Sequence, residues 1–211
     1  MIVPPTMITS IASTISKMVS SVGPMIAKYA PIVIDTVGNN FSKFTKIVEA
    51  ISKITNVFGP NDSVGVLGTK AMSAEKKPED FDNIGEYIKY LRNDVKIEPD
   101  KISTNPIDIL MRQVVGAAIA IKGIGNVLGA NVSLPFLNTV SKLDLDPKVI
   151  VEIAKSYEIS DVDPDGLQKY LDNSLSIEET CQHSKVLVSA YQMANPEMSL
   201  EEAEEAVMEL R

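Results

Sequence analysis

The chain is predicted to be all-α, with elongated amphipathic helices in its N-terminal part and a compact acidic helical module at its C-terminal end. Two observations predict this class. Apolar residues recur at three- and four-residue intervals over long stretches, which is the period of one helix face. No run of alternating β-branched residues lies between turn signals, as a half-buried strand would require. Aromatic residues are only 5% of the 211 and tryptophan is absent, a composition typical of thin helical bundles.

Residues 1–60 are predicted to form an amphipathic helical arm, either a hairpin or a coiled-coil-like helix. A first helix is expected from about Thr6 to Val22, because Gly23 and Pro24 then interrupt the apolar spacing. A longer helix is expected to begin at Pro31. Its apolar stripe would be unstable if exposed, so it predicts an interaction seam that needs a partner. The seam residues are Ile34, Val37, Phe41, Phe44, Val48, Ile51 and Phe58.

Residues 61–78 are predicted to be a linker or loop, because Gly59 to Pro78 has four glycines or prolines in its first ten positions and little periodicity. A central helical region is expected over residues 79–145. Within it, helical spacing of apolar residues predicts a helix from about Pro78 to Asp94.

Asn105 and Pro106 have the pattern of a helix cap followed by proline at the first helical position. They precede the most apolar stretch, Gln113 to Ala130, which has a single charged residue, Lys122. Its second half is rich in glycine, so it falls short of a confident spanning helix and could be either a bundle core or a membrane-inserting element. The residues of this possible membrane element are Val114, Val115, Ala118, Ile121, Ile124 and Val127.

Residues 146–211 are predicted to form an acidic module of four short helices, because a helix-start signal recurs four times. Two of these signals pair an aspartate with a following proline, and two are capping boxes with a serine three residues before a glutamate. The four pairs are Asp146 with Pro147, Asp163 with Pro164, Ser176 with Glu179, and Ser199 with Glu202.

The second aspartate–proline pair also lies in a possible calcium loop, since carboxylates occupy positions 1, 3, 5 and 12 of the EF-hand pattern. These residues are Asp161, Asp163, Asp165 and Asp172. Gln168 stands where such loops carry an aliphatic residue, the last ligand is aspartate instead of glutamate, and no second loop is present. A helix start at Pro164 is therefore the favoured interpretation, and no metal or cofactor is expected.

Cys181 and His183 are the only cysteine and histidine. Two positions apart on a helix, they would point about 200° apart, so a nucleophile–base pair is not expected. We expect a surface histidine and a half-buried cysteine. Gly125 and Gly129 form a GxxxG pair that would allow close helix packing, whereas a phosphate-binding glycine loop is not expected because no strand precedes it.

Charge is distributed unevenly along the chain, whose net charge is −8. Residues 1–60 contain five lysines and two acids, whereas residues 147–211 contain fourteen acids and five basic residues. Nucleic-acid binding is therefore not expected, while an anionic membrane could attract the N-terminal part. The first residues lack the basic and apolar segments of a signal peptide, so we expect a cytoplasmic protein or export by a non-Sec route.

These observations favour a non-enzymatic interaction or assembly protein that binds itself or a helical partner through the N-terminal seam. A second hypothesis is a membrane-active exported protein, pore-forming or translocator-like, that uses residues 1–60 and 113–130. An enzyme is the third hypothesis, because no arrangement of catalytic side chains can be identified in the sequence.

Overall fold

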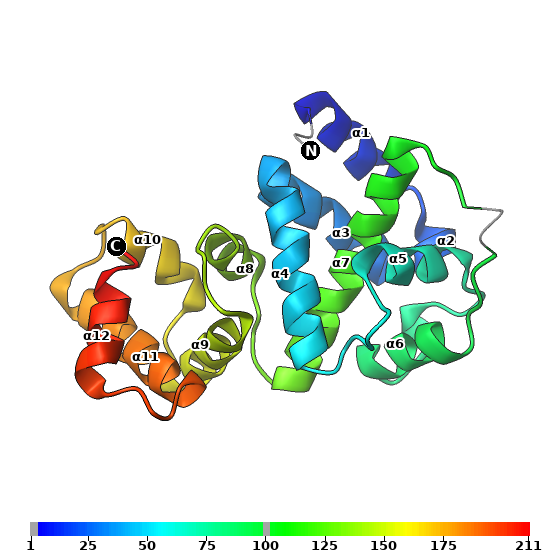
Figure 1. Ribbon diagram of the computed structural model, residues 1–211. Coiled ribbons are helices and arrows are strands. Elements are labelled where there is room, and N and C mark those ends of the chain that lie inside the picture. The colour runs from blue at the N-terminus through cyan, green and yellow to red at the C-terminus, as the bar shows by residue number, and fades with distance from the viewer. Residues whose placement is uncertain (1–3, 99–101) are drawn as a thin grey trace. The chain divides into compact units, whose positions relative to one another are not determined.

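The computed structural model describes residues 4–98 and 102–211 (Figure 1). Within these ranges every regular element is a helix, so the predicted all-α class is confirmed. The chain divides into two compact units, Met1–Val127 and Leu128–Arg211, each of which is described by itself. The division falls inside residues 79–145, which the sequence pattern suggests as one central region.

The N-terminal unit consists of helices that pack around α7. Its α-helices are α1 (Pro5–Ser16), α2 (Val19–Val22), α3 (Pro24–Val37), α4 (Phe41–Ile54), α5 (Val64–Ser73), α6 (Ile84–Asn93) and α7 (Pro106–Leu128), with 3-10 turns η1 (Gly38–Asn40) and η2 (Pro78–Asp80). The first predicted helix is present as α1 and α2, which a turn at Lys17 separates. α1 packs against α3, so these two helices form a hairpin.

The predicted long helix is two helices, α3 and α4. It breaks at Gly38, whose φ of +52° is a backbone conformation that glycine adopts more easily than other residues. The predicted start at Pro31 is wrong, because α3 begins at Pro24 and contains Pro31 in its interior. The break lets the apolar stripe continue on two short helices instead of one extended arm.

Residues 61–78 are not the predicted linker, because Val64–Ser73 forms α5. One of the glycines that suggested a loop, Gly68, forms a helix contact here. A Cβ atom on Gly68 would lie 1.8 Å from the carbonyl oxygen of Arg112, and one on Gly116 would lie 1.7 Å from that of Val64. α5 and α7 therefore cross at a distance that only glycine permits on both helices.

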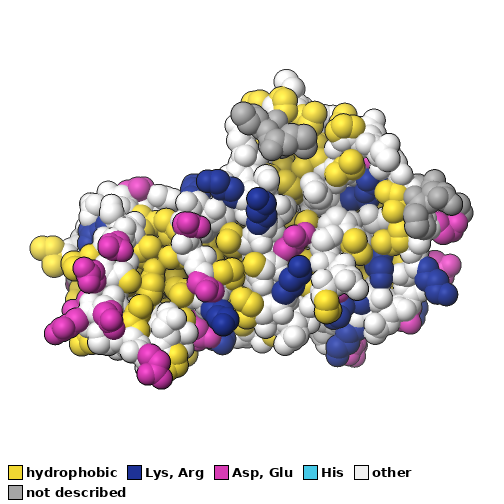
Figure 2. All heavy atoms as spheres, viewed as in Figure 1, with side chains coloured by type: hydrophobic (Ala, Val, Ile, Leu, Met, Phe, Trp, Pro, Cys, Tyr) yellow, Lys and Arg dark blue, Asp and Glu magenta, His cyan; other side chains and the backbone are white. Residues whose placement is uncertain are grey.

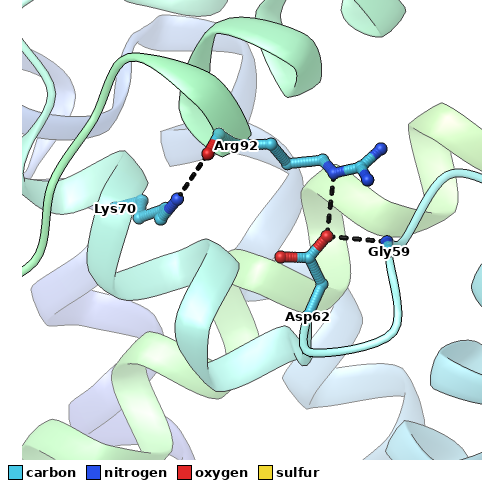
Figure 3. Close-up of polar contacts among 4 residues, drawn as sticks. All are labelled: Gly59, Asp62, Lys70 and Arg92. Carbon is cyan, nitrogen blue, oxygen red and sulfur yellow. Dashed lines mark hydrogen bonds and ion pairs between the residues drawn. The ribbon is translucent and has the colours of Figure 1, made fainter.

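A polar network ties the loop after α4 to the end of α6 (Figure 3). The Asp62 carboxylate accepts hydrogen bonds from the Gly59 backbone N–H at 2.7 Å and pairs with Arg92 Nε at 2.8 Å. Lys70 Nζ of α5 donates to the Arg92 carbonyl oxygen at 2.9 Å. The loop after α4 and the following helix α5 are thus both joined to the end of α6.

The starts of α6 and α7 are set by side-chain caps. α6 begins at Ile84, later than predicted, because the Asn83 side chain accepts a hydrogen bond from the Glu86 backbone N–H at 3.1 Å. At α7, Asn105 Oδ1 accepts from the Ile107 backbone N–H at 2.9 Å, as the predicted cap requires. Such caps satisfy N–H groups that have no partner inside the helix.

The C-terminal unit packs α11 against α9 and α12. Its elements are α8 (Leu134–Val140), α9 (Pro147–Ser160), η4 (Pro164–Gly166), α10 (Leu167–Leu171), α11 (Ile177–Ala194) and α12 (Leu200–Met208). All four predicted helix starts are confirmed, and both capping boxes form. The sequence analysis did not predict α8, whose cap is Ser133.

Candidate functional site

The predicted interaction seam lies in the interior of the folded chain. All seven side chains of the seam are 4% exposed or less. The outer face of α4 instead carries exposed lysines, namely Lys43, Lys46 and Lys53. The exposed surface of this helix is therefore rich in basic side chains, while the apolar stripe serves as core.

The possible membrane element is the centre of α7. Val114, Val115, Ala118, Ile121 and Ile124 are 2% exposed or less, and the eight residues from Val114 to Ile121 are buried without interruption. Val127, the last member of the set, is 53% exposed. Within the described ranges, no helix has the length and apolar character needed to span a membrane.

The charged residue of this stretch, Lys122, rests on an aromatic ring. Its Nζ lies 4.2 Å from the centre of the Tyr29 ring of α3, a cation–π contact. Burial raises the pKa of Tyr29 to about 12, so the phenol stays neutral beside the lysine.

Gly129 of the GxxxG pair makes no close helix contact. A Cβ on Gly129 would meet nothing within 4 Å, and this residue has a φ of +60° just after α7. Besides Gly116, Gly123 of this stretch lies against another element, since a Cβ there would lie 2.5 Å from Ile88 of α6. The close approach that the glycines suggested thus occurs at Gly116 and Gly123.

The carboxylates of the possible calcium loop are not gathered around a common point. Asp163 caps η4 by accepting from the Asp165 backbone N–H at 3.0 Å, while Asp165 accepts a hydrogen bond from the Ser133 hydroxyl. Asp172 accepts from Gln168 Nε2 at 3.1 Å, one helical turn away. No group of three metal-ligating side chains occurs among the residues that the structure describes. The segment is a helix start.

The expected surface histidine is instead buried, and the expected half-buried cysteine is exposed. His183 is 5% exposed, whereas Cys181 lies on the outer face of α11. The chain turns His183 inward because α11 presents its 183, 187 and 190 positions to the core. The local sequence around Cys181 and His183 did not by itself indicate which of the two side chains faces the core.

His183 belongs to a column of rings through the C-terminal unit. Its Nδ1 is 2.7 Å from the Tyr157 hydroxyl of α9, and its ring stacks on Tyr170 of α10 with centres 5.9 Å apart. Phe136 of α8 packs edge-on against Tyr157 at 6.0 Å. At the other end the Arg211 guanidinium lies 4.8 Å from the centre of the Tyr170 ring. The column joins α8, α9, α10 and α11 to the chain's last residue.

Burial shifts the pKa values of two members of this column, Tyr157 and His183. It raises the pKa of the Tyr157 phenol, with smaller contributions from Tyr170 and Asp163. It lowers the pKa of His183, although Asp163 and Glu179 act in the opposite direction. At neutral pH both groups are therefore uncharged, and the 2.7 Å contact is a hydrogen bond between neutral partners.

An open hollow of about 270 Å³ lies beside the column in the same unit. Its lining combines acidic groups with one of the rings, and it is formed by Asn131, Ala154, Tyr157, Glu158, Asp161, Val162, Asp163 and Pro164. Glu158 accepts a hydrogen bond from the Asn131 backbone N–H at 3.1 Å. Tyr157 and Asp163 line this hollow, which is open to solvent. Tyr157 is in turn the hydrogen-bond partner of His183.

The outer face of α12 combines apolar and acidic side chains. Leu200 is 54% exposed and Met208 is 68% exposed, while Ala203 and Val207, which lie next to Leu200 around the helix, are buried. The exposed pair and Glu204 follow one another at intervals of four residues, so they lie on one side of the helix. Figure 2 shows acidic side chains gathered where Figure 1 draws α11 and α12, with apolar side chains among them.

No known protein family, curated protein or solved structure matches this chain.

Proposed function

We propose that this chain is a non-enzymatic interaction protein whose acidic C-terminal unit binds a basic amphipathic helix. The observation that carries the proposal is the outer face of α12, where Leu200 and Met208 are exposed on either side of Glu204. Exposed apolar side chains with charged neighbours are typical of surfaces that bind a helix.

The charge of the unit determines the kind of partner. Residues 128–211 contain sixteen aspartates and glutamates against six lysines and arginines, a net charge of −10. Four exposed glutamates, Glu201, Glu202, Glu204 and Glu205, lie on α12 itself. A helix with lysine or arginine beside an apolar stripe would satisfy both the carboxylates and the apolar pair, whereas an anionic partner would be repelled.

The proposed interface lies on α12 and not on the N-terminal seam. Since the seam side chains are buried, they stabilise the N-terminal unit and are not available to a partner. The general class, a helical interaction protein, is the one that the sequence favours, and the binding surface is different.

A binding titration tests the proposal. The probe is a synthetic amphipathic helix made only of leucine and lysine, added to the full chain and followed by calorimetry in low and high salt. We expect binding with a Kd of roughly 10 µM or tighter, weakened by salt because exposed charges contribute to it. The absence of binding in low salt would refute the proposal.

Two variants separate the apolar and electrostatic contributions. Replacing both exposed apolar residues, Leu200→Ser with Met208→Ser, should weaken binding about tenfold, and Glu204→Gln with Glu205→Gln should remove most of the salt dependence. An exposed residue of another helix, Ile159 at 76% exposure, gives the matched control Ile159→Ser. Equal losses in the control and in the α12 variants would mean that the peptide binds unspecifically.

A membrane-active protein is the second candidate function, and one observation favours it. α7 is buried on all sides from Val114 to Ile121. A helix that is apolar all round is typical of a protein core or of a bilayer. In the same unit α4 has a lysine face that could approach anionic lipid.

Flotation with liposomes tests this second function. Full chain that floats with anionic vesicles, but not with neutral ones, would support it. The triple variant Lys43→Gln, Lys46→Gln and Lys53→Gln should then lose flotation, since these exposed lysines can be changed without disturbing the core. Ala118→Asp is unsuitable, because Ala118 is fully buried and the change would unfold the unit in any case.

A further inference from the structure

His183 is enclosed by four different elements of the C-terminal unit. It extends from α11 to the Tyr157 hydroxyl of α9 and the ring of Tyr170 of α10. On a further side is Gly166 of η4, where a Cβ would lie 2.6 Å from Nε2. The glycine therefore leaves space for the imidazole, and the imidazole in turn holds η4 and α10 against α9 and α11.

The surroundings of His183 suit a neutral imidazole better than a protonated one. A neutral imidazole has one nitrogen that accepts and one that donates, whereas the protonated ring has two donors. If the Tyr157 hydroxyl donates to Nδ1, it must turn around and accept after protonation, and its hydrogen then points into the core. If Nδ1 already donates to Tyr157, the added proton sits on Nε2, against Gly166. In either tautomer, protonation costs a buried hydrogen bond or leaves a buried charge.

The charged groups around the imidazole ring offset only part of this cost of protonation. Asp163, before η4, and Glu179, on α11, favour the protonated form. The Arg211 guanidinium lies against Tyr170, the ring that stacks on His183, and a cation there disfavours a second positive charge. Lys169 of α10 acts on Glu179. The remaining neighbours are the aromatic rings of Tyr157 and Tyr170. Neither carboxylate forms an ion pair with the ring among the described contacts.

We propose that His183 is an acid-sensitive latch, and that uptake of one proton by its imidazole releases the segment from Asp163 to Leu171 from α9 and α11. The segment is short and begins at a cap, so it can open without unfolding α11 or α12. The open hollow beside Tyr157 and Asp163 gives water and protons access to the latch. Opening would expose Leu167 and the two tyrosines, which are 2% exposed or less.

The direction of the pH effect follows from the difference in the His183 pKa between the closed and open states. Burial lowers the pKa of folded His183 below its ordinary value of 6.5, so the open state binds a proton more readily than the closed state. The closed state is therefore fully stable above pH 6.5 and loses stability as the pH falls toward the folded pKa. The ratio of open to closed chains should rise by up to about tenfold for each pH unit within this window.

The experiment follows the full chain by NMR and by hydrogen exchange between pH 7.5 and pH 5. Because His183 is the only histidine, its ring resonance reports this group alone. We expect a folded pKa below 6.5 and amide exchange in the Asp163–Leu171 segment that rises above its ordinary pH dependence as the pH falls. A folded pKa at or above 6.5, or unchanged protection of this segment at pH 5, would overturn the proposal.

Variants distinguish a latch from a merely structural residue. His183→Gln keeps a neutral hydrogen-bonding side chain, so the extra opening at pH 5 should disappear. Tyr157→Phe keeps the ring but removes the hydroxyl, so the opening should move to higher pH, and this readout remains if His183→Gln fails to fold. Lys185→Gln, on the exposed face of α11, is the control and should leave the pH profile unchanged. A wild-type pH profile in Tyr157→Phe would refute the latch.

Discussion

The two units of this chain obtain their stability in different ways. The N-terminal unit depends on close apolar packing around α7, including the contact of Gly68 with Gly116. The C-terminal unit depends on capped short helices around a column of rings that contains a titratable histidine. The stability of the first unit should therefore respond most to changes in side-chain volume, and that of the second to pH and to changes in capping groups.

The largest effect is expected from truncation of the seam. Phe44 of α4 is fully buried and stacks near Phe41, with ring centres 6.5 Å apart. Phe44→Ala should destabilise the N-terminal unit by about 3 to 5 kcal/mol, because it removes apolar contacts and leaves a cavity. Chemical denaturation measures this loss. A variant as stable as the wild type would mean that the ring does not serve as core.

The second effect concerns the glycine crossing. Gly116→Ala should cost about 3 kcal/mol, because the new Cβ would meet the Val64 carbonyl oxygen and force α5 away from α7. The matched control is Gly65→Ala on α5, where the nearest atoms are 3.8 Å away. This control should be neutral or stabilising by up to about 1 kcal/mol, since alanine favours helix. Similar losses at both positions would contradict the crossing.

The contrast between the two units also explains which of their features could be predicted from the sequence. The helix starts in the C-terminal unit were predictable, because a cap needs only residues two or three positions apart, such as Ser176 and Glu179. The fold class was predictable for a similar reason, since a helix face repeats within a few residues.

Contacts between distant residues could not be predicted in this way. Gly68 was interpreted as part of a loop because glycine is common in turns, and only its partner Gly116 on another helix makes it a packing residue. Tyr157 and His183 are 26 positions apart, so nothing in the local sequence connected them. Similarly, an apolar stripe requires a covering surface, but the stripe does not indicate whether the same chain or a partner provides it.

The third prediction uses the caps of the C-terminal unit. Ser176→Ala and Ser199→Ala each remove the side-chain acceptor of a capping box, in which the serine accepts from the N–H three residues later at 3.2 Å. Each change should cost about 1 kcal/mol. Thermal denaturation and far-UV circular dichroism measure the loss, and two variants with wild-type stability would show that the unit does not depend on these caps.

The smallest effects are expected for a cation on a ring in each unit. Lys122→Gln removes the cation at 4.2 Å from Tyr29, and Arg211→Gln removes the one at 4.8 Å from Tyr170. Each should cost about 0.5 to 1 kcal/mol, the usual contribution of such a contact near the surface. The Arg211 variant has a second readout. Because Arg211 lies beyond the ring that stacks on His183, its loss should also raise the pKa of the histidine. NMR of the single histidine measures this shift, and an unchanged pKa in Arg211→Gln would contradict an electrostatic effect of Arg211 on the imidazole.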